Sequence, residues 1–295
     1  MLLSLVMTSL CPSPIAAQQQ PLKVYISVDM EGIAGVVTGD QLGPTGFEYQ
    51  RFREFMTAEA LAAVEAAKQA GATEIVVSDS HGNGQNLLIE RFPADVTVIR
   101  AWPRPLGMME GIDSTFAAAI FIGYHSSTAN PAGVRAHTFS SANYAGFKAN
   151  GRELSEGGWN AMIAGHFGVP VVLISGDEAA IADLRPVVPD VEAAIVKHSI
   201  SFHSAATATP QAAQALIKLK VGQALGRRQA IKPVARPANV TVELTFKSYL
   251  PSMMLAYLPW FTRISSHAVR FEAKDMVEAS RIMQFVGAYE VGLTP

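Results

Sequence analysis

Two carboxylates stand two residues apart in the motif V-D-M-E-G, where Asp29 and Glu31 follow an apolar segment at residues 22–28. Residues i and i+2 of an extended chain point to the same side, so both carboxylates can reach one ion while Met30 turns into the core. A carboxylate has two oxygens and can bridge two cations. Two ions about 3.5–4 Å apart are the arrangement of two-metal hydrolases. The motif therefore favours a metal site of that kind.

Two histidines follow other apolar segments in the same way. His81 lies in S-D-S-H-G after residues 74–78, and His125 lies in G-Y-H after residues 117–123. In open α/β sheets, sites form at the carboxyl ends of the strands. Each residue alone has an ordinary explanation as a turn, cap or loop residue. Two carboxylates and two imidazoles at three strand ends together predict a metal centre.

The elements that must position these side chains can be read from the apolar pattern. Stretches rich in β-branched residues predict strands at residues 22–28, 74–78, 96–99, 117–123 and 169–175. Helices are predicted at residues 47–70 and 155–167, each ended by a glycine. Strands that alternate with helices predict an α/β fold with a mainly parallel sheet flanked by helices.

The pattern changes after residue 188. We expect helices at residues 191–200, 211–225 and 275–289 and strands at residues 239–246 and 268–273. Asp275 and Glu278 form a capping-box arrangement at the start of the last helix. We therefore expect a metal-binding α/β catalytic domain at residues 21–188 and a smaller C-terminal α+β domain at residues 189–295. A stretch rich in methionine and aromatic residues, 249–261, is interpreted mainly as core, with a specificity pocket or a subunit contact as alternatives.

Composition narrows the class of protein. Hydrophobic residues make up 49% of the 295-residue chain, which is ample for a large core. A formal net charge of -2 and the lack of any run of five like charges disfavour nucleic acid and polybasic membrane binding. The sole cysteine is Cys11, so metal binding must use His, Asp and Glu side chains.

The N-terminal residues have the form of a secretory signal. Residues 2–10 are mostly apolar, and small residues end at Ala17, which predicts a signal peptide at residues 1–17. The apolar stretch is shorter than the roughly 20 residues that span a bilayer, so no stable membrane span is expected. We expect an exported, periplasmic or extracellular protein. Lipidation of Cys11 is the alternative, which the large Leu10 before it disfavours.

The sequence also resembles the zinc-dependent D-aminopeptidase family typified by the bacterial dipeptide-operon enzyme. The shared motifs are S-V-D-M-E-G at 27–32, D-S-H at 79–81, G-Y-H at 123–125, G-V-x-x-H at 133–137, E-x-x-x-N-A at 156–161 and F-E-A-K-D-M at 271–276. The resemblance implies a metallo-aminopeptidase that releases N-terminal D-amino acids from short peptides or amides through a water activated by two zinc ions. It also implies a homo-oligomer, a decamer of stacked pentamers.

The resemblance assigns roles to individual residues. It implies two zinc ions in each subunit, with Asp29 bridging both. Glu31 and His81 would complete one ion, and His125 and Glu156 would complete the other. The resemblance alone favours Glu156 over its neighbour Glu153.

It also implies that His137 is the catalytic histidine, as an acid-base, a stabiliser of the intermediate or a nucleophile. The sequence departs from the family pattern at Gly157 and Trp159, where the typifying enzyme has leucines. We expect Trp159 to reshape the substrate pocket.

Other interpretations remain at this point. The ligand set suits manganese or cobalt as well as zinc. The rival functions are another two-metal hydrolase, such as a phosphoesterase or amidase, and an exported protein that binds peptide or metal without turnover. Asp79 is interpreted as a support for His81 or a helix cap, and Asp177 is a weaker candidate for the site.

Overall fold

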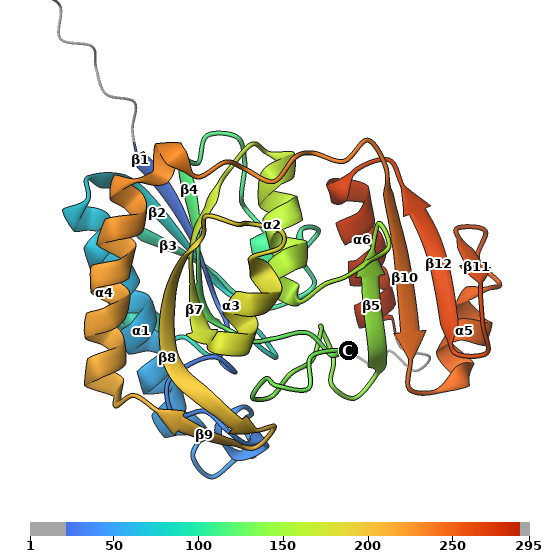
Figure 1. Ribbon diagram of the computed structural model, residues 1–295, viewed down its shortest axis with the longest axis horizontal. Helices are drawn as coiled ribbons and strands as arrows, with labels where there is room; N and C mark the ends of the chain where they lie inside the picture. Colours follow the sequence, from blue (N-terminus) through green and yellow to red (C-terminus); the bar gives the residue numbers. More distant parts are fainter. Residues whose placement is uncertain (1–21, 290–295) are drawn as a thin grey trace, which may run out of the picture.

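Seven strands form the central sheet of the computed structural model, which describes residues 22–289 (Figure 1). The predicted signal peptide and Cys11 lie outside the described residues. The strand order is β3-β2-β1-β4-β7-β8-β9, and every neighbouring pair is parallel except β8 with β9. The strands are β1 (Leu22–Val28), β2 (Ala72–Asp79), β3 (Val96–Ile99), β4 (Ala118–Tyr124), β7 (Val171–Asp177), β8 (Glu192–Ser201) and β9 (Ser204–Thr207).

Helices cover both faces of this sheet. On one face α1 packs against α4, and α2 and α3 lie on the other (Figure 1). Their bounds are α1 (Tyr49–Gln69), α2 (Glu156–His166), α3 (Glu178–Leu184) and α4 (Pro210–Gly226). Because helices cover both faces, the central strands are largely buried, and all seven residues of both β4 and β7 are buried. The predicted mainly parallel α/β fold is confirmed.

A second sheet of five antiparallel strands lies beside α2 and has the order β11-β12-β10-β5-β6. These strands are β5 (Tyr144–Ala149), β6 (Arg152–Glu153), β10 (Val240–Phe246), β11 (Phe261–Arg263) and β12 (Ala268–Ala273). Helix α6 (Met276–Ala288) contacts both this sheet and α2, and α5 (Tyr249–Leu255) packs on the strands at the far end (Figure 1). Helix α6 begins at its Asp275 cap, whose side chain accepts from the backbone N–H of Glu278.

The two sheets do not follow the predicted division at residue 188. Strands β8 and β9 and helix α4, all beyond that residue, belong to the first sheet and its covering layer. Strands β5 and β6, which precede it, belong to the second sheet. The helix predicted at residues 191–200 is wrong, because this segment pairs with β7 as β8. The described part of the chain also contains short connecting 3-10 helices, namely η1 (Gly39–Gln41), η2 (Ile89–Arg91), η3 (Gly107–Met109) and η4 (Arg228–Ala230).

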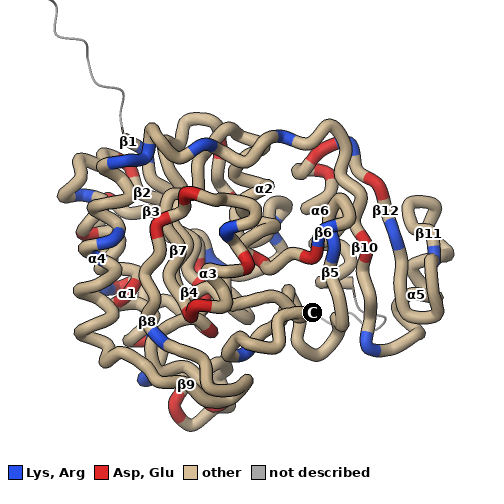
Figure 2. The backbone as a smooth tube through the Cα atoms, viewed as in Figure 1, with Lys and Arg blue, Asp and Glu red and all other residues tan. Residues whose placement is uncertain are grey.

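Charges are distributed over the described elements without a continuous stretch of one sign (Figure 2). Among residues 22–289, no helix has both the length and the apolar content that crossing a membrane requires.

Candidate metal centre

The first sheet places the predicted ligands at its topological switch point. From β1 the chain runs outward to β2 and β3, and it then returns to β4 on the other side of β1. Asp29 and Glu31 follow β1, His125 follows the neighbouring β4, and His81 follows β2. Open α/β sheets bind ligands in the crevice at such a point, because the loops diverge there. The sequence-based placement of these four residues at the strand ends is confirmed by the sheet order.

Gly32 allows the loops after β1 and β4 to approach each other. A Cβ on this residue would lie 2.1 Å from the carbonyl oxygen of Tyr124, so no larger residue fits. The backbone N–H of Gly32 instead donates to the carbonyl of Gly123 at 2.7 Å. This close contact brings the carboxylates after β1 next to the imidazole after β4.

His81 faces both of these carboxylates. Its Nδ1 lies 3.3 Å from Oδ1 of Asp29 and 2.8 Å from Oε2 of Glu31. Its Nε2 lies 2.7 Å from the backbone carbonyl of Leu42 and serves as the donor to it. In the neutral ring, which a bound cation favours, Nε2 carries the proton and Nδ1 presents a lone pair toward the carboxylates.

His125 and Glu156 form the other half of the centre. Nε2 of His125 lies 3.3 Å from Oδ2 of Asp29 and 3.5 Å from Oε1 of Glu156. Its Nδ1 lies 3.0 Å from the carbonyl of Ser126, so a backbone oxygen again fixes the ring. Glu156 is the first residue of α2, where the helix dipole favours a carboxylate, and Ser155 caps that helix. Asp29 therefore lies between two histidines, as expected for a bridging ligand.

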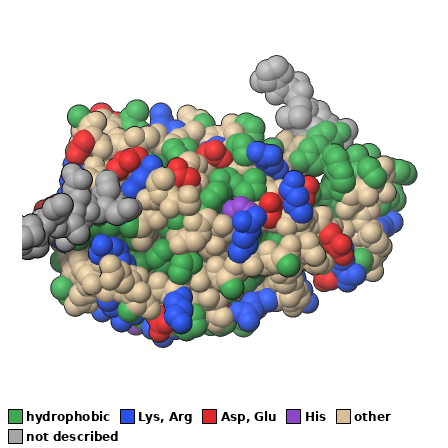
Figure 3. All heavy atoms as spheres, turned by 90° about the horizontal axis from the view of Figure 1, so that it is seen from above, with side chains coloured by type: hydrophobic (Ala, Val, Ile, Leu, Met, Phe, Trp, Pro, Cys, Tyr) green, Lys and Arg blue, Asp and Glu red, His purple; other side chains and the backbone are tan. Residues whose placement is uncertain are grey.

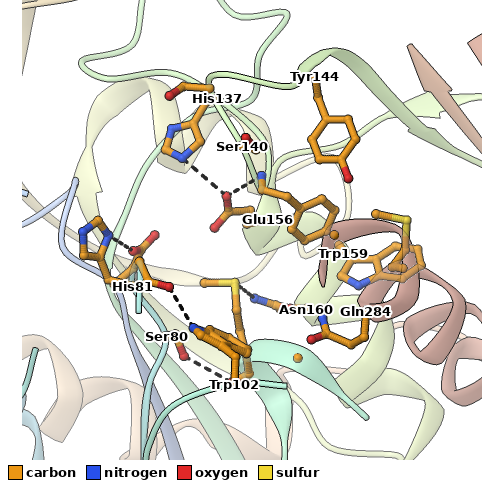
Figure 4. A pocket seen from close by; sticks show the side chains of 18 of the residues that line it. Ser80, His81, Trp102, His137, Ser140, Tyr144, Glu156, Trp159, Asn160 and Gln284 are labelled. Atoms are coloured by element: carbon orange, nitrogen blue, oxygen red, sulfur yellow. Dashed lines mark hydrogen bonds and ion pairs between the residues drawn. The ribbon is translucent and has the colours of Figure 1, made fainter. Parts of the chain in front are cut away.

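His137 lies over the same cluster. Its Nε2 is 3.9 Å from Oε1 of Glu31 and 3.8 Å from Oε1 of Glu156, and its Nδ1 is 2.8 Å from the carbonyl of Arg135 (Figure 4). Two residues of this segment, Arg135 and Phe139, adopt positive φ values of 57° and 62°. Strained backbone of this kind is held in place by its surroundings and is found at functional sites. All six residues predicted for the site thus line one cavity.

The chemistry of the donor set fits metal ions. Asp29, Glu31 and His125 offer ligand atoms within 4.8 Å of one another, and so do His125, His137 and Glu156. Within the described residues, three buried atoms of the site lack a hydrogen-bond partner, namely Oδ2 of Asp29, Oε2 of Glu31 and Nε2 of His125. Buried polar atoms without partners are costly, and a cation between them removes that cost.

The pKa shifts of these residues also favour bound cations. Burial and the charge of Glu31 raise the pKa of Asp29. Burial disfavours the ionised form of Glu31 as well, but the charge and hydrogen bond of His81, together with the nearby charges of His137 and His125, outweigh it and hold the pKa of Glu31 well below its usual value. Burial disfavours the protonated forms of His81 and His125, yet the facing carboxylates raise both pKa values well above the ordinary one. The cluster therefore requires positive charge, which metal ions supply.

Asp79 supports the loop of His81 without touching its ring. Its carboxylate accepts from the backbone N–H groups of Asn86 and Leu87 at 2.6 and 2.7 Å. The side-chain amide of Asn86 donates in turn to the carbonyl of His81 at 2.6 Å. Asp79 therefore supports the loop that carries His81, but it neither orients the imidazole directly, whose Nε2 lies against the carbonyl of Leu42, nor caps a helix. Asp177 caps α3 and accepts from the backbone N–H of Val134 at 2.8 Å, and it does not line the cavity.

The cavity at this centre has a volume of about 560 Å³, which suits a small peptide. Sequence reasoning did not find the opposite wall, which includes Met108 from η3 and Met283 and Gln284 from α6. Figure 4 shows Gln284 and Trp159 facing the cavity beside Asn160. The capping box predicted where α6 begins, but no local signal shows which element its buried face meets.

Comparisons with known proteins agree with one another. A family model described as D-aminopeptidase, of peptidase family M55, matches residues 22–285. A D-aminopeptidase of Bacillus subtilis is 34% identical over 263 residues, which cover 89% of this chain and 95% of that protein. The solved structure of the Zn-dependent D-aminopeptidase DppA from Bacillus subtilis, described as a self-compartmentalizing protease, matches with a TM-score of 0.86. That alignment has 33% identity and covers 90% of this chain and 96% of the other.

Proposed function

This chain belongs to the D-aminopeptidase family, and from that membership we propose that it releases N-terminal D-amino acids from short peptides with the help of two zinc ions. Membership makes the chain a metal-dependent aminopeptidase. The ligands in this proposal are Asp29, Glu31, His81, His125 and Glu156.

One observation supports the proposal most directly. Asp29 lies 3.3 Å from an imidazole nitrogen on either side, Nδ1 of His81 and Nε2 of His125. A carboxylate with one histidine at each oxygen suits a bridge between two ions, and each histidine has a further carboxylate beside it. Each imidazole also has its second nitrogen on a backbone carbonyl, which is the usual orientation of metal-binding histidines.

When bound, two zinc ions supply Lewis acidity, which polarises a scissile carbonyl and lowers the pKa of a water molecule. The other steps fall to side chains of this chain. Glu156 also accepts from the backbone N–H of Phe139 at 2.6 Å, which holds its carboxylate against the loop that carries His137. The cavity thus keeps its ligands and its proton-transfer group in one fixed arrangement.

His137 is suited to move a proton at Nε2. Its Nδ1 donates to the carbonyl of Arg135, so the neutral ring has a lone pair on Nε2, which faces the cluster. That nitrogen can take a proton from an attacking water and give it to the leaving amine. Its side chain is 12% exposed, compared with 8% for His81 and 1% for His125, so it is the most accessible of the three histidines to a substrate.

The test is the release of D-alanine against L-alanine from matched aminoacyl amides and dipeptides. We expect D-selective release by the zinc-loaded protein that is lost with a chelator and restored by zinc. The control is an Asp29→Ala variant, which should lose both the activity and bound zinc by metal analysis. Phosphate-ester hydrolysis without amide hydrolysis at full zinc content would contradict the proposal and identify a different two-metal hydrolase.

We further propose that the chain forms a closed homo-oligomer through the end of the molecule that carries α5. The stretch at residues 249–261, interpreted mainly as core, is largely exposed there, with Tyr257 at 78% and Trp260 at 61%. The space-filling view shows hydrophobic side chains gathered at this end (Figure 3). Exposed aromatic and methionine side chains are typical of interface centres. The self-compartmentalizing relative supports this proposal.

Export of the protein is also a proposal, supported by the composition of residues 1–17. Expression of the full chain in a bacterial host tests it. We expect the protein in the periplasm or medium, with a mature N-terminus near Gln18 by mass spectrometry. Recovery of the intact chain from the cytoplasm alone would contradict export.

A further inference from the structure

The wall of the cavity away from the metal ligands is apolar and comes from three separate parts of the chain. Met108 lies in η3, Trp159 in α2 and Met283 in α6. Leu106, Phe139 and Tyr144 extend the same surface. A substrate can place its scissile bond at the metal centre. It must then either pack an apolar group against this wall or leave the wall exposed to water.

The wall offers no partner for a charged side chain. Of the described residues that line the cavity, the acidic ones are Asp29, Glu31 and Glu156, all assigned to the metal centre, and none is Lys or Arg. A charged group brought here would lose its water without gaining a counter-ion, which is strongly unfavourable. The polar groups that remain, including those of Asn160 and Gln284, are uncharged.

Trp159 brings this wall next to the reacting centre. It stands three residues after Glu156 on α2, so the two side chains lie on the same side of the helix. Phe147 packs edge-on against the indole with ring centroids 5.3 Å apart, and Phe139 does so at 6.3 Å. The indole is therefore fixed and 2% exposed, and it forms a rigid surface beside a metal ligand.

The neighbouring side chains are also held in place. The amide group of Asn160 donates to Oη of Tyr124 at 2.9 Å and contacts the sulfur of Met108 at 3.1 Å. Gln284 packs closely on η3, because a Cβ on Gly107 would lie 3.0 Å from its Nε2. Helix α6 therefore closes the cavity against η3, and the two methionines supply polarizable surface that adapts to different apolar shapes.

We propose that Met108, Trp159 and Met283 form the subsite for the side chain of the substrate's N-terminal residue, and that it selects neutral apolar side chains larger than methyl. This inference rests on the aminopeptidase function proposed above. It predicts release of leucine, methionine or phenylalanine in preference to alanine, and discrimination against lysine and glutamate.

The first experiment measures kcat/KM for D-leucyl, D-phenylalanyl, D-alanyl, D-lysyl and D-glutamyl amides with the zinc-loaded protein. Each methylene in an apolar subsite changes discrimination by about 10-fold or more, so the leucyl amide should exceed the alanyl amide by at least that factor. Met283→Ala should lower the ratios of the leucyl and phenylalanyl values to the alanyl value about tenfold. Equal values for the leucyl and alanyl amides in the unaltered protein would overturn the proposal.

A charge placed in the wall gives a second, independent test. Gln284 is only half-buried, so Gln284→Lys should fold, and it puts a cation where none now lies. We expect kcat/KM of this variant to rise at least tenfold for the glutamyl amide and to fall for the leucyl amide. Gln223→Lys adds the same charge at an exposed position of α4 outside the cavity and should change neither. No gain on the glutamyl amide by Gln284→Lys would count against the subsite.

Affinity measurements distinguish a failure of this inference from a failure of the proposed reaction. Calorimetry of free D-leucine, D-phenylalanine, D-alanine and D-glutamate with the zinc-loaded protein should give the same order of affinity as the amides. If turnover is absent but the order of affinity is retained, the proposed function is refuted and the apolar subsite is supported. A flat or reversed order of affinity would refute the subsite, whatever the turnover.

Discussion

The imidazole rings of His125 and His137 lie parallel, with centroids 4.1 Å apart and an interplanar angle of 7°. In the proposed function the inner ring, that of His125, is a metal ligand, and the outer ring, that of His137, transfers protons in the cavity. The proposal therefore gives two neighbouring histidines different roles, which substitution can separate.

His137→Ala should lower kcat/KM by about 10²–10⁴-fold, the usual contribution of general acid-base catalysis. It should retain both metal ions, because all five proposed ligands remain. The control is His125→Ala, which should lose metal as well as activity. Kinetics together with metal analysis check both points. Loss of an ion from the His137 variant would instead make this residue a ligand.

Lys197→Met should weaken zinc binding by about 10–100-fold, as changes next to metal ligands commonly do. Lys197 is buried, and its Nζ donates to the backbone carbonyls of Glu31, Ile33 and Val36. It therefore fixes the loop that carries the Glu31 ligand. Competition with a chromophoric chelator measures the affinity. Lys220→Met, at a partly exposed pair with Glu192, is the matched control and should leave the affinity unchanged.

Glu59→Gln should become more stable relative to the unaltered protein as pH rises. Burial raises the pKa of Glu59 to about 7, so the folded state holds its proton more tightly than the unfolded state does. The resulting cost to stability is absent below the unfolded pKa near 4.5 and fully present above about pH 7. Its size is at most about 3 kcal/mol, and the variant lacks it.

Urea unfolding at pH 5 and pH 8 measures this difference. Glu59 accepts from the backbone N–H of Ala34 at 3.0 Å, and a glutamine oxygen can keep that bond. The control is Glu65→Gln, which removes an exposed carboxylate from the same helix. Parallel stability curves for Glu59→Gln and the unaltered protein would contradict the prediction.

Tyr257→Glu should reduce the oligomer to smaller species, because it places a charge in the exposed apolar surface around α5. Light scattering coupled to size exclusion measures the mass. Phe47→Glu is a matched control, since Phe47 is 82% exposed and is distant from α5 in the sequence. If both variants keep the mass of the unaltered protein, the α5 end is not the subunit contact.

The sequence predicted the elements whose pattern is local and strong. The buried strand Leu22–Val28 and the helix Tyr49–Gln69 lie where the apolar pattern indicated. The segment Glu192–Ser201 contains Ala, Glu and Lys, which favour a helix, but pairing with β7 overrides that preference. Strand β5 was missed because its main partner, β10, lies nearly a hundred residues further along the chain.

The site residues were predictable from the sequence only where a general rule applies to their position. Asp29, Glu31, His81 and His125 follow strands, so the general rule for strand ends located them. Glu156 and His137 follow no such rule, and only the family resemblance indicated them. The apolar wall was not predicted, apart from the expectation that Trp159 reshapes the pocket, because it joins elements that are distant in the sequence.

The position of α6 also has a consequence for protein synthesis. Met283 and Gln284 complete a cavity whose first ligand, Asp29, leaves the ribosome some 250 residues earlier. The second sheet is also completed late, because β5 can pair with β10 only after residue 246 has been synthesised. The strand-end loops that carry proposed ligands therefore precede, along the chain, every element of α6 and the second sheet that completes the cavity. If domains fold in the order of their synthesis, the wall that would hold substrate is completed last.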